Sequence, residues 1–236
     1  MNERSSGLSL ERDGGLSPIN RTILAQRIKT EIDAACIQLY NETEPRRHLG
    51  ASVIGEECSR RVWYLFHWWK PEVFTARMLR LFNRGHREEE RFVQWLRAIG
   101  YQVYDVDPNT GDQWRIKAVK GHFGGSLDGI GGVPYPELNG LHMLLEFKTH
   151  NAKSFAKLKK DKVAKSKPRH YKQMCTYGRA YQYRVGLYFA ICKDDDDIHV
   201  EIVELDWSLG DDMYRRADEI INARLPPPRN APGSWR

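Results

Sequence analysis

The stretch Met143-Leu144-Leu145-Glu146-Phe147-Lys148 decides the fold of this 236-residue chain. Its composition fits a β-strand, in which successive side chains point to opposite faces of the sheet. The odd-numbered side chains are all apolar, so their face must pack on a core: Met143, Leu145 and Phe147. The opposite face carries Glu146 and Lys148, beside Leu144. A buried strand with a charged pair on one face is therefore the starting point.

Glu146 and Lys148 place a carboxylate and an ammonium side by side at the end of this strand. The carboxylate can bind a hard cation such as Mg²⁺. The amine can orient or deprotonate a water molecule, or neutralise a phosphate. This Asp/Glu-x-Lys triplet is the only one in the chain. Taken alone, it fits an ordinary cross-face ion pair better than a catalytic site, so further residues are needed.

A second acid lies in the glycine-rich segment Gly124–Gly129, within a predicted strand over residues 122–130. If Leu127 faces the core, Asp128 points the other way, and the flanking glycines leave room for a ligand. Asp128 precedes Glu146 by 18 residues, which is enough for a hairpin connection. Two acids brought together repel unless a cation lies between them. The alternative is a turn aspartate beside a glycine.

A third acid belongs to a predicted helix over residues 74–99, ended by Gly100. Its apolar stripe, counted back by three and four residues, leads to Glu89, with His86 one turn earlier on the same face. The stripe consists of Phe92, Val93, Leu96 and Ile99. An acid on an inward face is costly unless it is paired or binds a metal. Alternatively, the stripe ends early and Glu89 lies at a wet helix start.

The segment from Lys153 to Lys172 holds nine Lys or Arg residues and one acid, Asp161. Such a surface attracts phosphates and releases counterions when it binds them. A solvated helix face or a mobile loop is the alternative interpretation. Gln173 and Tyr177 follow at i and i+4 on a predicted helix over residues 170–183, where they can contact nucleic acid or simply pack in the core.

The remaining periodicities complete a mixed α/β (α+β) fold. Ser52 is the expected N-cap of the next helical stretch, and a helix over 58–68 should turn Val62, Leu65 and Phe66 inward. Further helices are predicted over 19–43 and 209–223, and further strands over 101–106, 114–119, 185–192 and 198–205. This order predicts a central mixed β-sheet flanked by helices in one domain over 19–224. Residues 1–18 are expected to form a disordered arm, and residues 225–236 a Pro-rich tail.

The bulk properties restrict the class of protein. A formal charge of +6 is a mild bias towards polyanions. The four cysteines form no CxxC pair, which argues against a zinc finger or a disulfide framework. There is no apolar run long enough to cross a bilayer and no signal-like start. We therefore expect a cytoplasmic protein without membrane association.

These pieces come in one order: Gly-x-x-x-Glu, Gly-x-x-Asp-Gly, Glu-x-Lys, then Gln-x-x-x-Tyr. That order resembles the PD-(D/E)xK nuclease superfamily, and within it the RecB-like and phage recombination exonuclease branch. The segment Ser52–Arg61 also resembles the N-terminal segment of many RecB-like nucleases. Leu127 stands in place of the superfamily's proline, which this branch often lacks. Cys58 has no C-terminal cysteine set with it, so no iron–sulfur cluster is expected.

The resemblance implies a restriction-endonuclease-like core and a set of residue roles. Mg²⁺ or Mn²⁺ would be held by four groups, with His86 as the alternative helix ligand: Glu89, Asp128, Glu146 and the backbone carbonyl of Phe147. Lys148 would be the catalytic lysine beside Asp128 and Glu146. Gln173 and Tyr177 match the branch's Gln-x-x-x-Tyr motif and would contact DNA. From their charge, the basic residues are expected to hold DNA by its phosphates: Arg60, Arg61, Lys153, Lys157 and Lys172. The resemblance also implies the cytoplasm of a bacterium or a phage-infected host. The products would carry a 5′-phosphate and a 3′-hydroxyl.

The expected function is a metal-dependent deoxyribonuclease, an exonuclease acting in DNA recombination, repair or phage DNA processing. Two alternatives stay open: a non-catalytic DNA-binding or recombination-partner protein on a nuclease fold, and a structure- or site-specific endonuclease with the same centre. DNA is the expected partner, with a single-strand annealing or recombination protein as the second candidate. The sequence leaves open the digestion polarity, the strand preference and the oligomeric state.

Overall fold

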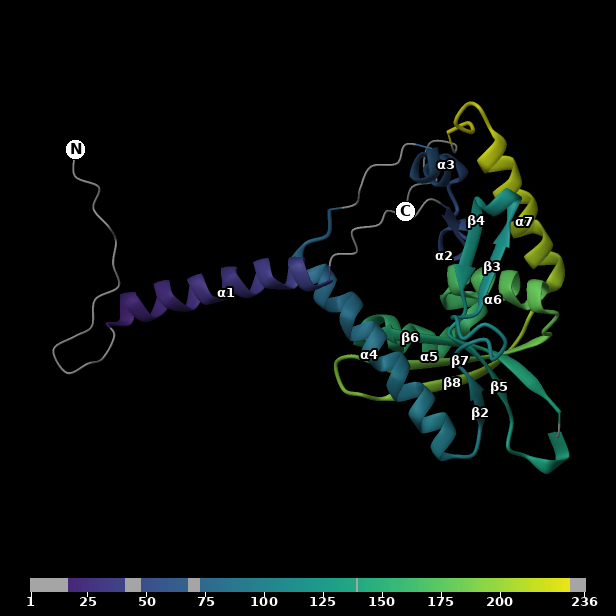
Figure 1. The fold of residues 1–236 in the computed structure, drawn as a ribbon, viewed down its shortest axis with the longest axis horizontal. Helices are drawn as coiled ribbons and strands as arrows, with labels where there is room; N and C mark the ends of the chain where they lie inside the picture. The colour runs from purple at the N-terminus through teal and green to yellow at the C-terminus, as the bar shows by residue number, and fades with distance from the viewer. Residues whose placement is uncertain (1–16, 41–47, 68–72, 139, 230–236) are drawn as a thin grey trace. The chain divides into compact units, whose positions relative to one another are not determined.

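The computed structural model describes residues 17–40, 48–67, 73–138 and 140–229 (Figure 1). The chain divides into two compact units: Met1–Glu44 with Glu72–Arg84, and Pro45–Pro71 with Gly85–Arg236. Most of the predicted N-terminal arm and the end of the Pro-rich tail lie outside the described residues. Within the described residues, no helix combines the length and the apolar character needed to cross a bilayer.

The first unit contains α1 (Pro18–Tyr40) and the start of α4 (Ala76–Ala98). Both helices were predicted, with similar bounds where residues are described. In α1, Cys36 is the one buried residue. Asp33 pairs with Arg80 of α4 at 2.5 Å. The three- and four-residue spacing therefore predicted a helix correctly, although Ile28, Ile32 and Leu39 are exposed.

The second unit is built on two mixed β-sheets flanked by helices, which confirms the predicted fold class. The five-stranded sheet has the order β2-β5-β6-β7-β8, with β6 and β7 parallel and the other pairs antiparallel. Its strands are β2 (Gln102–Tyr104), β5 (Gly129–Gly132), β6 (His142–His150), β7 (Val185–Cys192) and β8 (Ile198–Glu204). The three-stranded sheet is β1 (Leu49–Gly50), β4 (Phe123–Ser126) and β3 (Arg115–Ala118), in that order.

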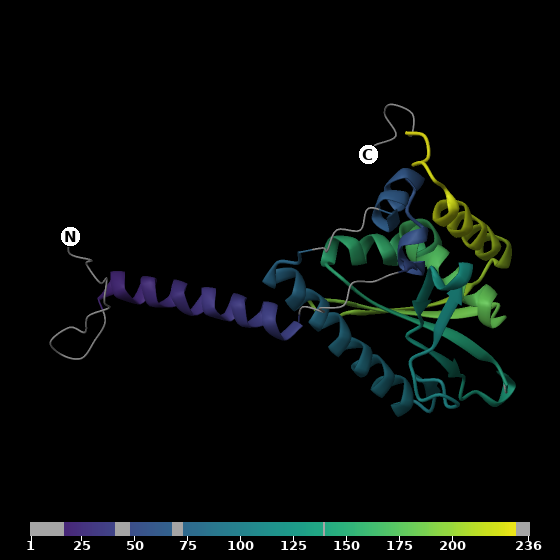
Figure 2. The ribbon, with the colours of Figure 1, turned by 45° about the horizontal axis from the view of Figure 1, so that its top comes forward.

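Helices cover both faces of the five-stranded sheet, with α4 on one face and α5 and α6 on the other (Figure 2). Towards α4, the sheet presents the apolar residues Met143, Leu145, Phe147, Leu187, Phe189 and Ile191, packed on Phe92, Val93 and Leu96. The core on the opposite face of the sheet includes residues of five further helices. These are α2 (Ala51–Ile54), α3 (Ser59–His67), α5 (Ala152–Ser166), α6 (Pro168–Tyr181) and α7 (Trp207–Asn222); two short 3₁₀ turns are η1 (Val119–Gly121) and η2 (Pro136–Leu138).

The prediction of one strand over residues 122–130 is wrong. The chain leaves the three-stranded sheet after β4 and enters the five-stranded sheet at β5, so Leu127 and Asp128 form a crossing between sheets. Leu127 is fully buried, and its N–H donates to the Trp114 carbonyl. A Cβ at Gly129 would lie 3.0 Å from the Tyr104 carbonyl oxygen, so a glycine permits this close approach. The change of sheet is what aims Asp128 at β6.

Two further local predictions are corrected. Ser52 lies inside α2, whose N-cap is Gly50, because the helix begins directly at the end of β1. On α3, Val62 is buried as predicted, whereas Leu65 is 45% exposed. The basic segment forms the helix α5, which begins after Asn151, whose side chain accepts a hydrogen bond from the Ser154 N–H.

Candidate metal and catalytic centre

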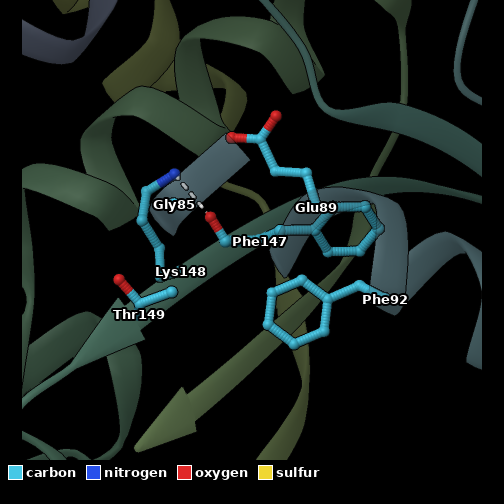
Figure 3. Close-up of a pocket in the computed structure, with 6 residues that line it drawn as sticks. All are labelled: Gly85, Glu89, Phe92, Phe147, Lys148 and Thr149. Carbon is cyan, nitrogen blue, oxygen red and sulfur yellow. Dashed lines mark hydrogen bonds between the residues drawn. The ribbon is translucent and has the colours of Figure 1, made fainter. Parts of the chain in front are cut away.

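Glu146 lies at the centre of the site and is completely buried. Neither of its carboxylate oxygens has a hydrogen-bond partner. The Lys148 ammonium is 2.5 Å from Oε1, close enough for an ion pair but outside hydrogen-bonding geometry. Lys148 instead donates to the Phe147 carbonyl at 2.9 Å (Figure 3). A buried carboxylate without hydrogen bonds is costly, and a bound cation would offset that cost.

Asp128 reaches the same place from the crossing between the two sheets. Its Oδ2 accepts a hydrogen bond from the Phe147 N–H at 2.6 Å and lies 3.8 Å from the Lys148 ammonium. The carboxylates of Asp128 and Glu146 therefore both lie within ion-pair distance of the Lys148 ammonium. The hydrogen bond from the Phe147 N–H holds the Asp128 carboxylate against β6, the strand that carries Glu146 and Lys148. The position of the Asp128 carboxylate therefore depends on the backbone of β6.

The two charges of this centre influence each other strongly. Burial raises the pKa of Glu146 to about 7, partly opposed by the nearby Lys148 charge and reinforced by Asp128. Burial alone would lower the pKa of Lys148, but the charges of Glu146 and Asp128 outweigh it and raise that pKa. Lys148 is therefore protonated at neutral pH and can act as a cationic donor.

Glu89 lies at the rim of the centre, on α4. It lines a cavity of about 170 Å³ together with Gly85, Phe92, Phe147, Lys148 and Thr149. Figure 3 shows its carboxylate on the same side of this cavity as the Lys148 ammonium. Burial and repulsion by Asp128 raise the pKa of Glu89, while His86 and Lys148 lower it.

The alternative helix ligand, His86, has a different environment. Its side chain is 70% exposed and lies outside the residues that line the cavity, with Nδ1 3.7 Å from the Glu89 carboxylate. The neighbouring Glu88 is buried, although the helical count placed it to one side, and it pairs with Arg91 at 2.7 Å. Of the candidates on this helix, Glu89 is therefore the one that faces the centre.

The donor set suits a hard divalent cation. Among the described residues, no group of three or more His, Cys, Asp or Glu side chains lies in an arrangement that could hold a metal ion. The groups that could hold such a cation are the Asp128 and Glu146 carboxylates and the Phe147 carbonyl, and the Glu146 oxygens lack hydrogen bonds. Glu89 borders the same cavity as Phe147 and would complete the set from the rim.

Gln173 and Tyr177 lie behind this centre on α6, and neither is on an open surface. They are 8% and 1% exposed, and Gln173 Nε2 donates to the Tyr177 hydroxyl at 3.5 Å. A Cβ at Gly125 would lie 2.5 Å from that hydroxyl, so a larger residue there would displace the Tyr177 side chain. Burial and the Glu146 charge raise the pKa of Tyr177. These contacts place the pair as a wall of the centre.

The basic residues separate into two groups. Lys153 and Lys157 are exposed and lie in the first two turns of α5, which follows the end of β6. The other three already contact protein atoms: Arg60 donates to the Pro227 carbonyl, Arg61 to Glu56, and Lys172 to the Gly55 carbonyl. The α5 face is therefore the freer cationic surface.

A buried polar chain beside the centre was not foreseen. The Tyr188 hydroxyl lies 2.9 Å from His150 Nε2 and 2.8 Å from His170 Nδ1. Ser154 Oγ lies 3.2 Å from His150 Nδ1 and accepts from Lys167. Tyr188 is also the cross-strand neighbour of Glu146. Strand alternation puts His150 on the same face of β6 as Lys148. Its partners, Tyr188 and Ser154, lie on β7 and α5, so the spacing of residues along β6 could not reveal them.

Comparison with known proteins gives a likeness of fold. No family model and no curated protein matches the chain. An alkaline exonuclease from Laribacter hongkongensis, LHK-Exo, superposes with a TM-score of 0.51 at 18% identity, over 81% of this chain and 90% of that chain. LHK-Exo in complex with dAMP gives 0.50 at 17% identity, with the same coverage. SSO0001 gives 0.50 at 15% identity, over 84% and 87%. The chain thus shares its fold with an exonuclease.

Proposed function

We propose that this chain is a metal-dependent DNA nuclease that works as an exonuclease. The observation that carries the proposal is the buried Glu146 carboxylate, unpartnered by hydrogen bonds and set beside Lys148 and Asp128. The likeness to LHK-Exo, which has been solved with dAMP, supports a nucleic-acid substrate. The PD-(D/E)xK resemblance of the motifs supports the same chemistry.

The proposed cation, Mg²⁺ or Mn²⁺, would be held by Asp128, Glu146 and the Phe147 carbonyl, with Glu89 closing the set. When bound, it would increase the acidity of the attacking water and neutralise charge that develops on the phosphate. Lys148 donates to the Phe147 carbonyl at 2.9 Å. A carbonyl oxygen has two lone pairs, so it could keep this bond and still face a cation. The other N–H groups of the ammonium could donate to a phosphate oxygen.

Lys148 serves in this proposal as a positioning donor and a source of positive charge. The surrounding carboxylates raise its pKa, so it stays protonated and is a poor base at neutral pH. A fixed ammonium stabilises negative charge on the phosphate without reorganising during the reaction. The base that takes the proton from water would be a second water or a phosphate oxygen.

The strand would be held by its phosphates on α5. Lys153 and Lys157 are exposed there, and α5 begins two residues after β6 ends. Phosphate contacts of this kind position a nucleic acid without reading its sequence. A sequence-independent grip suits an exonuclease better than a site-specific endonuclease.

The test is incubation of end-labelled linear DNA and covalently closed circular DNA with Mg²⁺, with Mn²⁺, and with a chelator. We expect metal-dependent release of nucleotides from the linear DNA only. Lys148→Ala should abolish cleavage and leave DNA binding near normal. Cleavage of the closed circle would replace the exonuclease by an endonuclease. Binding without cleavage in either metal would instead support the non-catalytic alternative.

A further inference from the structure

The outer edge of β8 carries unused backbone hydrogen-bonding groups. No described strand pairs with this edge. On the β7 side, the flanking bonds run from Leu205 N to the Arg184 carbonyl and from Cys192 N to the Asp197 carbonyl. Hydrogen-bonding direction alternates along an antiparallel strand. The odd-numbered residues of β8 therefore bond to β7, and the even-numbered residues direct their N–H and C=O groups outward.

These same even-numbered residues bear exposed aliphatic side chains. Ile198, Val200 and Ile202 are 48%, 50% and 57% exposed. Across the register they continue a buried apolar row of β7, which consists of Ile191, Phe189 and Leu187. An exposed β-branched edge strand without proline is a template for pairing with another strand.

The opposite face of β8 is already covered by the chain itself. The His199 ring packs edge-to-face on Phe155 of α5, and the Glu201 carboxylate accepts a hydrogen bond from the Val163 N–H. His199 also lies 3.1 Å from Glu201. The free surface is therefore the backbone edge with the aliphatic row beside it, which fits an added strand rather than a helix.

The order Ile198-x-Val200-x-Ile202 is symmetrical about its centre. If two β8 strands pair antiparallel about an axis at Val200, Val200 opposes Val200 and Ile198 opposes Ile202 of the second copy. All outward backbone groups of these residues then gain partners. On the other face His199 opposes Glu201, so no like charges meet between residues 198 and 202. This self-complementarity identifies a second copy of the chain as the occupant.

We propose that two copies of this chain associate through antiparallel pairing of β8 with β8, about a two-fold axis at Val200. The two five-stranded sheets become one continuous sheet. At either end, Glu204 approaches the acidic turn Asp194–Asp197 of the second copy, which weakens the pairing and makes it dependent on concentration. The interface lies at the sheet edge, two strands from Glu146, so it is independent of the proposed nuclease activity.

The test is the mass of the full-length chain, measured by light scattering over a concentration series. We expect the wild-type mass to approach twice the 27.5 kDa of one chain at high concentration. Val200→Lys puts two ammonium groups face to face and should give a monomer. Ile99→Lys, at a 62% exposed site in the turn after α4, should leave the dimer intact.

Two further measurements address the register. An equimolar mixture of Val200→Lys and Val200→Glu should restore a heterodimer by native mass spectrometry, because opposite charges then meet at the axis. In the wild type, the amides of Val200 and Ile202 should exchange with solvent more slowly as concentration rises. A wild-type monomer at all concentrations, a trimer, or a dimer that Val200→Lys leaves unchanged would each overturn the proposal.

Discussion

The two faces of β6 have opposite chemistry, although they alternate along one strand. Towards α4, Leu145 and its neighbours are packed in an apolar cluster. On the other face, Glu146, Lys148 and His150 are polar and largely buried. The first face lowers the free energy of the folded chain by removing apolar area from water. The second places charges where burial disfavours them. The comparison indicates that one face of β6 maintains the fold and that the other carries the candidate site.

The sharpest way to test that division is to neutralise the charged pair. We expect Glu146→Gln with Lys148→Met to reduce cleavage by at least about 10³-fold, since both a metal ligand and a cationic donor are lost. Without metal, the double variant should be as stable as the wild type or more stable by about 1–4 kcal/mol, because a buried ion pair is replaced by neutral groups of similar size. Denaturant titration of the metal-free protein checks this; a large loss of stability would contradict it.

The converse change removes packing on the other face. Leu145→Ala should lower the free energy of unfolding by about 2–5 kcal/mol, because Leu145 is fully buried and a cavity would remain. Cleavage per folded molecule should change by only a few-fold. Ile99→Ala, at an exposed position, is the matched control and should stay within about 0.5 kcal/mol of the wild type. Equal losses in both variants would show that burial at Leu145 does not govern stability.

A third experiment tests which residue of α4, Glu89 or His86, belongs to the candidate metal site. Glu89 borders the cavity with Lys148, whereas His86 is 70% exposed. We expect Glu89→Gln to reduce metal-dependent cleavage by about 10²-fold and to weaken Mn²⁺ binding in calorimetry, since a carboxylate ligand is lost. His86→Gln should change either quantity by about twofold at most. The reverse ranking would make His86 the helix ligand.

The smallest expected effect concerns pH and two histidines: the buried His150 on the polar face of β6, and the half-buried His170 on α6. Burial, followed by the charges of Lys167 and Lys148, lowers the pKa of His150 to about 4. Burial, followed by Lys148, lowers the pKa of His170 to about 3. Unfolded histidine titrates near about 6.5. Below that pH the unfolded chain binds more protons, so stability should fall as the pH falls from about 6.5 towards the folded values.

Thermal unfolding of the metal-free chain at several pH values measures this slope. His170→Gln should reduce the loss of stability between about pH 6.5 and pH 4, because one half-buried neutral base is removed. His122→Gln, at an exposed position, serves as the control and should leave the slope as it is. A slope that His170→Gln does not alter would mean that the histidine is not the source of the pH dependence.

The sequence predicted most of the fold, and it did so best where local patterns were strong. The alternation over 143–148 correctly separated the apolar and charged faces of β6, and Gly100, at φ 90°, ends α4 as expected. The break between β4 and β5 was missed because glycines carry no facing preference, so their segment looks continuous. Leu65 was misjudged because an apolar residue near a helix end need not be covered.

The candidate centre was only partly predictable. Asp128 and Glu146 could be paired because hairpin-like spacing brings neighbouring strands together. The burial of Gln173 and Tyr177 depends on how α6 packs, which two residues at i and i+4 do not specify. The chain from Lys167 through His150 to His170 joins several elements, and only tertiary structure brings them together.

The strand β6 and the basic helix α5 are joined with almost no spacer. His150 ends β6, Asn151 caps the next helix, and Ala152 begins α5. The distance along the chain from Lys148 to Lys153 is therefore set by regular backbone and cannot be absorbed by a flexible connection. Inserting one residue at this joint would rotate the helix by about 100° and turn its lysines to another side. The junction therefore fixes the spacing between Lys148 and Lys153. We expect insertions to be tolerated far better in the loops elsewhere in this fold than at this point.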